Sequence, residues 1–461
     1  MKRKRCVAPV SNPDRNSQTT APPDDGGVCQ ETVTDSIAVK VEHVYKVFGR
    51  RAAEVVTRLE RGATRDEVNA MGTAAVIDAS FSVRAGEIFV VMGLSGSGKS
   101  TLIRMLNGLL PATSGTVTIG DDLITDISPA RLREVRRRRV SMVFQHFALL
   151  PHRSVLDNVA YGLEIQGVAR AERIERARET VALVGLDGWE DKLPDELSGG
   201  MKQRVGLARA LATDTDVLLM DEAFSALDPL IRREMQEQLI RLQSSLGKTI
   251  IFITHDLNEA MFLGDRIAVM RDGRIVQVGT PEEILTDPAN DYVEQFVHDV
   301  DRARVLTAAS VMEPARAIVG PASGPRAALR LMRDQQTSAA FMTARDRTLL
   351  GAIRDWDALT LARNGGRDLE SILDRDVTPV RSDTALSDLF VPAVESALPL
   401  PVVDENGRLV GVIPRVTLLA ALGNVMPTEE LAVIEQPPSV VADAITDFLE
   451  QPTSSAEEVA V

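Results

Sequence analysis

The sequence is poor in cysteine and has no long apolar run. Only two cysteines occur in 461 residues, Cys6 and Cys29, and they lie apart from any histidine cluster. This excludes a disulfide framework and a zinc site, and it suits a reducing compartment. No segment reaches the ~18 consecutive apolar residues of a membrane span. The basic start, Met1–Arg5, lacks the ~7–15 apolar residues that complete a secretory signal. We therefore expect a cytoplasmic chain that reaches a membrane only through a partner.

Basic residues are outnumbered, with 52 Lys and Arg against 66 Asp and Glu and a net charge of −14. This balance counts against a nucleic-acid-binding role. Residues 428–461 hold eight acidic residues and no Lys or Arg. Residues 1–36 are rich in Pro, Asp, Ser, Thr and Gly. Both ends are expected to be disordered, as an N-terminal tail over 1–36 and an acidic tail over 424–461.

Between the tails, the sequence changes its pattern near residue 300. Up to there, short apolar runs such as Ile88–Met92 and Val217–Met220 alternate with helical patterns. One such helix would place Leu102, Leu106 and Leu109 on a single face. The alternation predicts an α/β domain over 37–300, with a parallel sheet covered by helices.

Residues 301–423 read as two similar halves. Each half has the order strand, turn, strand, and Gly351 and Gly411 occupy matching places 60 residues apart. The turn at Asn406-Gly407 is the clearer of the two. Two related halves predict one small pseudo-symmetric α/β domain.

Residues 93–100, GLSGSGKS, match the phosphate-binding pattern G-x-x-x-x-G-K-[ST] at every fixed position. Glycines let backbone N–H groups turn toward phosphates, and the following helix adds its positive N-terminus. Lys99 should reach the β- and γ-phosphates, and the Ser100 hydroxyl should bind Mg²⁺. A plain Gly/Ser-rich turn is the alternative, which the Lys and Ser disfavour. The predicted ATP-binding residues here are Gly93, Leu94, Ser95, Gly96, Ser97, Gly98, Lys99, Ser100 and Thr101.

Two acidic residues, Asp221 and Glu222, follow the apolar run Val217–Met220. After a complete phosphate-binding loop, Asp221 is expected to hold Mg²⁺. Glu222 is then placed to polarise a water that attacks the γ-phosphate. The competing interpretation is a strand that ends in two solvated carboxylates.

Residues 197–201 read LSGGM, which resembles the signature motif of ATP-binding cassette (ABC) ATPases, usually LSGGQ. Here the motif consists of Leu197, Ser198, Gly199, Gly200 and Met201, so Met replaces Gln. The Ser hydroxyl, the glycine N–H groups and the start of a helix again form a phosphate cradle. The resemblance implies that this segment completes the ATP site of a second subunit, in a homodimer that encloses two ATP molecules.

The other motifs of that family follow in order. Gln145 resembles the glutamine that senses Mg²⁺ and the attacking water, and His255 resembles the switch histidine at the γ-phosphate. Phe48 resembles the aromatic that stacks on adenine, with Tyr45 as a competing candidate. The segment that resembles the D-loop is Ser225, Ala226, Leu227 and Asp228. The resemblance therefore assigns catalysis to Glu222, His255 and Gln145.

Three stretches, residues 86–95, 193–201 and 220–232, narrow the resemblance to the ATPase subunit of glycine betaine/L-proline importers. So does the extra segment from roughly Arg50 to Ala75. That family carries a C-terminal pair of cystathionine-β-synthase (CBS) modules, which matches the repeat. The resemblance implies a peripheral subunit on the cytoplasmic face of the inner membrane. It would use ATP and Mg²⁺ to drive uptake of a compatible solute during osmoprotection.

The partners implied are a second copy, permease subunits and, indirectly, a periplasmic or lipid-anchored substrate-binding protein. The CBS pair would sense ionic strength or a cyclic dinucleotide, or serve only as a dimer contact. The fold expected is a P-loop ABC cassette with a mixed sheet and a helical subdomain near 146–205, followed by a tandem CBS domain. Two alternatives stay open: an importer of an amino acid or sulfonate, and a non-transport ATPase on DNA or ribosomes. The 122 residues between Lys99 and Asp221 leave no long coiled coil for a DNA-repair ATPase.

Overall fold

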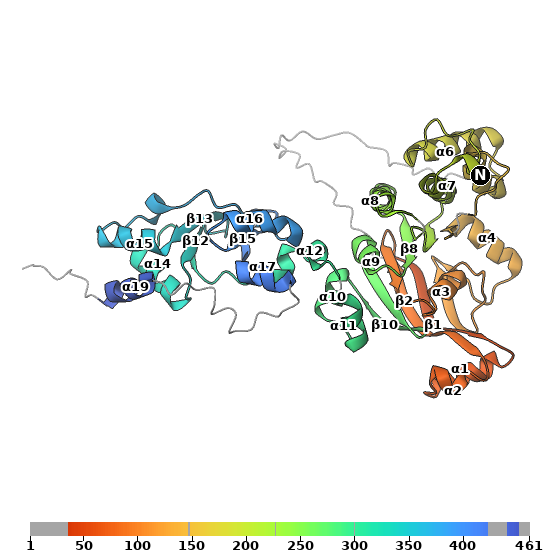
Figure 1. The fold of residues 1–461 in the computed structure, drawn as a ribbon, viewed down its shortest axis with the longest axis horizontal. Helices are drawn as coiled ribbons and strands as arrows, with labels where there is room; N and C mark the ends of the chain where they lie inside the picture. The colour runs from red at the N-terminus through yellow and green to blue at the C-terminus, as the bar shows by residue number, and fades with distance from the viewer. Residues whose placement is uncertain (1–35, 146–147, 226, 299, 423–439, 451–461) are drawn as a thin grey trace, which may run out of the picture. The chain divides into compact units, whose positions relative to one another are not determined.

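The computed structural model describes residues 36–145, 148–225, 227–298, 300–422 and 440–450. A six-stranded sheet has the order β10-β9-β3-β8-β7-β6. Its strands β3, β6, β7, β8 and β9 run parallel, and β10 pairs antiparallel with β9. Their bounds are β3 Ile88–Met92, β6 Val140–Val143, β7 Val217–Asp221, β8 Thr249–Thr254, β9 Arg266–Arg271 and β10 Arg274–Gly279. The predicted mixed-sheet α/β fold is confirmed (Figure 1).

A second sheet is antiparallel and has the order β2-β1-β4-β5. Its strands are β1 Ile37–Phe48, β2 Thr73–Arg84, β4 Ser114–Ile119 and β5 Asp122–Leu123. In the chain, β1 and β2 come before β3, and β4 and β5 come after it. The extra segment between β1 and β2 forms two short helices, α1 (Ala52–Glu60) and α2 (Arg65–Val68). Their apolar residues share a small core with Tyr45 and Val47 of β1.

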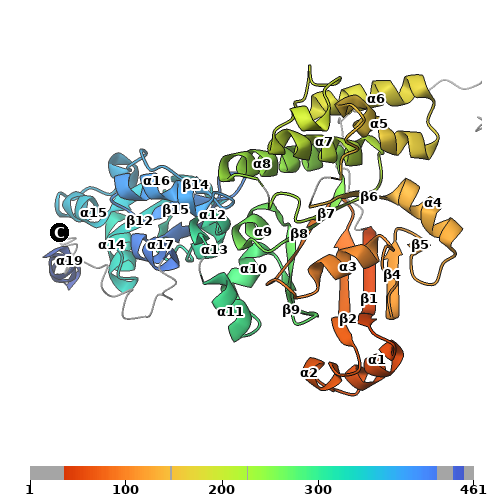
Figure 2. The same ribbon diagram turned by 45° about the vertical axis from the view of Figure 1, so that its right-hand side comes forward.

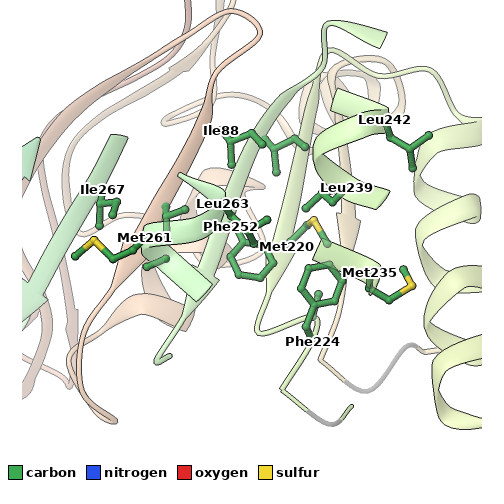
Figure 3. Close-up of a cluster of buried hydrophobic side chains, with 14 of the residues drawn as sticks. Ile88, Met220, Phe224, Met235, Leu239, Leu242, Phe252, Met261, Leu263 and Ile267 are labelled. Atoms are coloured by element: carbon green, nitrogen blue, oxygen red, sulfur yellow. The ribbon is translucent and has the colours of Figure 1, made fainter. Parts of the chain in front are cut away.

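The apolar runs become strands because helices cover them. Every residue of β3 and β7 is buried, as expected for the interior of a parallel sheet. Side chains from β3, β7, β8, β9, α8 (Pro229–Leu246) and α9 (Leu257–Leu263) converge in one core (Figure 3). Phe224 and Phe252 pack there with ring centroids 5.4 Å apart.

The helix after the phosphate-binding loop is shorter than predicted. Helix α3 spans Lys99–Leu106. Gly108 takes a positive φ of 66°, and Leu109 is 49% exposed. The prediction of one apolar face therefore holds for Leu102 and Leu106 and is wrong for Leu109, because the chain turns at Gly108. Helix α4 (Pro129–Arg139) leads into β6.

Three helices form a separate group within this domain (Figure 2): α5 (Val155–Gln166), α6 (Arg170–Leu183) and α7 (Gly199–Ala212). They pack on one another through buried residues such as Val159, Val181 and Val205. A 3₁₀ turn, η1 (Pro194–Glu196), precedes α7. This group falls in the predicted helical subdomain, and α7 continues beyond the expected boundary at 205. Among the described residues, no helix is long and apolar enough to cross a membrane.

Four short helices follow β10: α10 (Pro281–Thr286), α11 (Asp291–Val297), α12 (Arg302–Val305) and α13 (Ala308–Val311). Two three-stranded sheets come next, each with one parallel and one antiparallel pair. The first contains β11 Ile318–Val319, β12 Ala339–Thr343 and β13 Leu349–Arg354, with α14 Pro325–Asp334, α15 Asp355–Arg363 and η2 Leu369–Ile372. The second contains β14 Val380–Arg381, β15 Leu400–Val403 and β16 Leu409–Ile413, with η3 Leu386–Leu389, α16 Phe390–Glu395 and α17 Arg415–Leu422. The predicted repeat is therefore present.

Isolated β-bridges connect the two halves. Ala352 of β13 bridges Asp374, and Val412 of β16 bridges Glu313. At Gly351 a Cβ atom would lie 2.4 Å from the Asp374 carbonyl oxygen, and at Gly411 it would lie 2.9 Å from that of Glu313. The two matching glycines thus each let a segment from the other half approach closely, which explains why both halves have a glycine at this place.

Part of the acidic C-terminal segment is folded, contrary to the expected disorder. Helix α19 spans Val440–Glu450 and packs against α14 and α15. Ile445 and Phe448 join the core of the first repeat. The guanidinium of Arg326 lies 4.6 Å from the centroid of the Phe448 ring. The helix is therefore amphipathic, with Asp443 and Asp447 exposed. The acidic composition of the segment had led to the prediction of disorder.

We predict that Phe448→Ala undocks α19. Phe448 is 8% exposed, and truncating a buried Phe costs roughly 3 kcal/mol or more. That loss lowers amide protection across residues 440–450 on the order of 100-fold, as read by hydrogen exchange and mass spectrometry. Asp447→Ala, an exposed position on the same helix, is the control. Equal protection in Phe448→Ala and the control would refute the docking.

Candidate nucleotide-binding site

The loop between β3 and α3 has a backbone that only glycine tolerates at two positions. Gly93 has φ 152°, and a Cβ there would lie 2.2 Å from the Met270 carbonyl oxygen. Gly98 has φ 106°, and its Cβ would lie 2.3 Å from the Ala75 carbonyl oxygen. The first backbone N–H groups of α3 have no intrahelical acceptor. The loop therefore presents a ring of N–H donors suited to an anion.

Lys99 is buried at the first position of α3 and donates hydrogen bonds to the carbonyls of Gly93 and Leu94, at 2.7 and 3.1 Å. Burial lowers the pKa of Lys99, and the carboxylates of Glu222 and Asp221 oppose that effect. The ammonium is thus held at the loop by carbonyl oxygens that a phosphate oxygen could replace.

The Ser100 hydroxyl donates a 3.0 Å hydrogen bond to Asp221 at the end of β7. Asp221 is 5% exposed, and burial raises its pKa, while Ser100 and the guanidinium of Arg104, 3.9 Å away, oppose the rise. A hydroxyl and a carboxylate are the hard oxygen ligands that Mg²⁺ prefers. The residues present therefore fit the predicted metal.

Glu222 is the point where three loops meet. Its Oε2 atom lies 3.3 Å from Gln145 Nε2, after β6, and 3.2 Å from His255 Nδ1, after β8. Its backbone has φ 45°, and its N–H bonds to the Ile253 carbonyl at 3.0 Å. The three predicted catalytic residues are therefore brought into contact, at the carboxyl ends of neighbouring parallel strands.

The structure distinguishes the two candidate adenine aromatics. Phe48 is 44% exposed, with Lys46 Nζ 5.1 Å from its ring centroid. Tyr45 is 6% exposed and packs into the core formed with α1 and α2. Of these two candidates, Phe48 is therefore the one that offers a ring face for stacking. The contact of Lys46 with this ring was not predicted, because nothing in the local sequence pattern marks Lys46. Its ammonium also donates to the Pro111 carbonyl at 2.7 Å.

The signature residues lie at the start of α7. Ser198 caps the helix by accepting a 3.3 Å hydrogen bond from the Met201 N–H. Ser198 and Gly199 are exposed, Leu197 is buried, and Met201 packs partly against the core. A Cβ at Gly200 would lie 2.8 Å from a methyl group of Ile231 on α8. The phosphate cradle therefore faces outward from its own chain.

Other predicted residues fall nearby in the fold. Leu94, Ser95 and Gly96 form the exposed rim of the phosphate-binding loop, Ser97 is buried, and Thr101 lies half-buried on α3. In the D-loop, Ser225 and Leu227 are described, Asp228 caps α8 through the Ile231 N–H at 3.1 Å, and Ala226 lies outside the described residues.

Comparison with known proteins places these motifs in a family. The ABC transporter family model matches residues 76–225, and the CBS domain model matches residues 369–424, over the second repeat. Glycine betaine transport ATP-binding protein OpuAA of Bacillus subtilis is 52% identical over 388 residues, 84% of this chain and 92% of that protein. Glycine betaine/carnitine transport ATP-binding protein GbuA of Listeria monocytogenes is 49% identical over 83% of this chain and 97% of its own. Glycine betaine/proline betaine transport system ATP-binding protein ProV of Salmonella typhimurium is 47% identical over 84% of this chain and 98% of its own.

We predict that Asp221→Asn stabilises the nucleotide-free protein at neutral pH and disables ATP turnover. Because burial raises the Asp221 pKa, the folded state binds the carboxyl proton more tightly than the unfolded state. Its charge therefore costs stability above the folded pKa, and the cost disappears as pH falls through that pKa. The variant should melt higher than wild type at pH 7, and the difference should shrink toward pH 4.

Turnover in Asp221→Asn should fall by on the order of 100-fold, because a neutral amide replaces the charged carboxylate that would hold the metal in place. Asp287→Asn removes an exposed carboxylate and should change neither property. A variant that melts below wild type at neutral pH would contradict the burial argument.

Proposed function

We propose that this chain, which belongs to the family of glycine betaine transport ATP-binding proteins of ABC transporters, hydrolyses ATP to power uptake of a compatible solute. The substrate class is a quaternary amine such as glycine betaine, or proline. The contact of Glu222 with both Gln145 and His255 carries the ATPase assignment. The substrate class is supported by relatives that are about half identical over most of their length.

ATP binding follows from the loop geometry. The N–H groups of residues 93–101 and the ammonium of Lys99 receive the phosphates, and adenine stacks on the free face of Phe48. Ser100 and Asp221, with Gln145, are the residues that would hold Mg²⁺. The ion would neutralise charge on the phosphate oxygens.

Hydrolysis is assigned to Glu222 as general base. Gln145 and His255 both contact its Oε2 atom, so Oε1 is the oxygen that we assign to the attacking water. The water attacks the γ-phosphorus in line, its proton passes to Glu222, and the bond to the leaving ADP oxygen breaks. His255 and Lys99 stabilise the charge on the transferred group. Catalysis is mainly positioning and electrostatics, as is usual in phosphoryl transfer.

Each site is completed by a second copy of the chain. The exposed Ser198 hydroxyl and the N–H groups of Gly199 and Gly200 form an anion cradle at a helix N-terminus. Because this cradle faces outward from its own chain, we assign it to the γ-phosphate of an ATP bound at the phosphate-binding loop of the second subunit. Met201 in place of Gln leaves these donors unchanged.

A groove of about 340 Å³ between α4, β6, α5 and α7 is our candidate site for a permease segment. Phe144 and Ile165 place apolar surface there, 38% and 56% exposed. Asn158 shapes the adjoining chain, because its buried amide bonds to the backbone of Leu150, Arg153 and Ser154. With a permease bound here, the subunit would sit on the cytoplasmic face of the membrane, where ATP is available.

We propose that the C-terminal domain regulates transport by sensing ionic strength or a cyclic dinucleotide, with a plain dimer contact as the remaining alternative. A cavity of about 220 Å³ at the junction of its halves is lined by Leu349, Gly351, Arg375 and Gly407, among others. Sites for small molecules usually exceed ~300 Å³. A cyclic dinucleotide bound at this cavity would therefore need a second copy of the domain to enclose it.

Uptake of labelled glycine betaine tests the proposal. We would compare a strain that lacks this subunit with the same strain expressing wild type or Glu222→Gln, from low to high osmolarity. Uptake should appear only with wild type and rise with osmolarity. Glu222→Gln should still bind ATP, with turnover reduced on the order of 1,000-fold or more, because the water loses its base.

Purified-protein assays separate the two parts of the proposal. If wild type hydrolyses ATP but betaine uptake is unchanged, the substrate assignment is wrong. If Glu222→Gln keeps wild-type turnover, the general-base role is wrong.

A further inference from the structure

Arg232 lies on the first turn of α8, directly after the D-loop, and its guanidinium bridges two loops. Nη2 donates to the carbonyl of Leu227 at 3.0 Å and to that of Ser225 at 3.5 Å. Nη1 lies 3.4 Å from Oδ2 of Asp256, the residue that follows His255. One side chain therefore joins the D-loop to the loop that carries the switch histidine.

These contacts close a ring that passes through Glu222. The Ser225 N–H and hydroxyl bond to the Glu222 carbonyl at 3.2 and 2.9 Å. Arg232 then links Ser225 to Asp256, and the peptide chain leads to His255. His255 Nδ1 returns to Glu222 at 3.2 Å. Removing any member leaves the two loops joined by fewer contacts beside the reacting carboxylate.

A second tie holds the same loop to α8. The buried Glu259 carboxylate accepts a hydrogen bond from the Thr254 hydroxyl and, at 3.0 Å, one from Gln236 on α8. Thr254 in turn accepts the Asp256 N–H at 2.9 Å. Asp256 caps α9 by accepting the Glu259 N–H at 3.2 Å. These bonds fix the loop to the end of β8 and to α9. The Arg232 contact adds the link from this loop to the D-loop.

The ring also contacts the signature helix. Gln203 of α7 is fully buried and donates to the Ala223 carbonyl, next to Glu222. Gly200 of the same helix packs on Ile231, which precedes Arg232. A displacement of α7 would therefore press on both ends of the segment that contains Glu222 and Arg232.

We infer that Arg232 is a positioning residue, which ties the D-loop to the switch-histidine loop so that His255 and Glu222 stay aligned during hydrolysis. The inference rests on the proposed ATPase function. Arg232 touches no reacting atom in this arrangement, and it acts through Asp256 and the D-loop carbonyls. Binding of ATP should depend little on it, since the phosphate-binding loop and Phe48 lie on other elements.

The test compares Arg232→Ala, Arg232→Lys, Asp256→Asn and the double variant Arg232→Ala/Asp256→Asn in the full chain. Arg232→Ala should lower kcat about 10- to 100-fold, the range expected for a misplaced catalytic group. Its KM for ATP and its affinity for a fluorescent ATP analogue should stay within about twofold of wild type. Arg232→Lys should recover part of kcat, because an ammonium reaches one partner but not both loops.

The double variant should be no slower than Arg232→Ala, since both changes break the same link. Arg241→Ala is the matched control, because it removes a 67%-exposed arginine from the same helix. Additive losses, or an equal fall in kcat and ATP affinity with a lower melting temperature, would overturn the positioning role. Wild type without ATP turnover would instead refute the proposed function.

Discussion

The site depends on the placement of one carboxylate, that of Glu222. The residue follows β7 in a left-handed backbone conformation with φ 45°, which is costly for a residue with a Cβ atom. Its N–H is held by the Ile253 carbonyl of β8, and its side chain meets groups that follow β6 and β8. Because β6, β7 and β8 run parallel and adjacent, their carboxyl ends deliver these three side chains to one place. The buried apolar sheet below is what keeps that geometry fixed.

Charge balance is the second constraint on the site. Lys99 and Asp221 are both almost fully buried, and burial shifts the pKa of each toward its neutral form. Their opposite charges offset part of that cost, and Ser100 and two carbonyls satisfy the remaining hydrogen bonds. Burial remains the larger effect for both groups, so each charge still carries a net cost. A nucleotide with its metal would supply opposite charge to both groups, so the unliganded site is primed for a phosphate and a cation together.

Much of this arrangement could be predicted from the sequence, because its motifs are local. The phosphate-binding loop needs glycines at fixed spacing, and the apolar runs before Gly93 and Asp221 became fully buried strands. Long-range packing decided the remainder. The sequence favoured Phe48 but left Tyr45 as a competitor for adenine. In the fold, the α1–α2 segment buries the Tyr45 ring and Phe48 stays exposed. Arg232 ends one of the stretches that mark the family, but its role could not be predicted, since its partners lie on loops that only the fold brings together. Helix α19 was missed because acidic composition outweighed an apolar stripe of two buried residues.

We propose that two chains share each ATP site, with Ser198 of one opposite the phosphate-binding loop of the other. The direct measurement is thiol cross-linking of a chain that carries Ser95→Cys and Ser198→Cys. Cys6 and Cys29 would be replaced by serine, and Glu222→Gln would prevent turnover. Both positions are exposed in the single chain. We expect a cross-linked dimer that forms with ATP and Mg²⁺ and not with ADP, and that is absent when either cysteine is omitted. Cross-linking within one chain, or a dimer that forms equally well without nucleotide, would contradict the shared site.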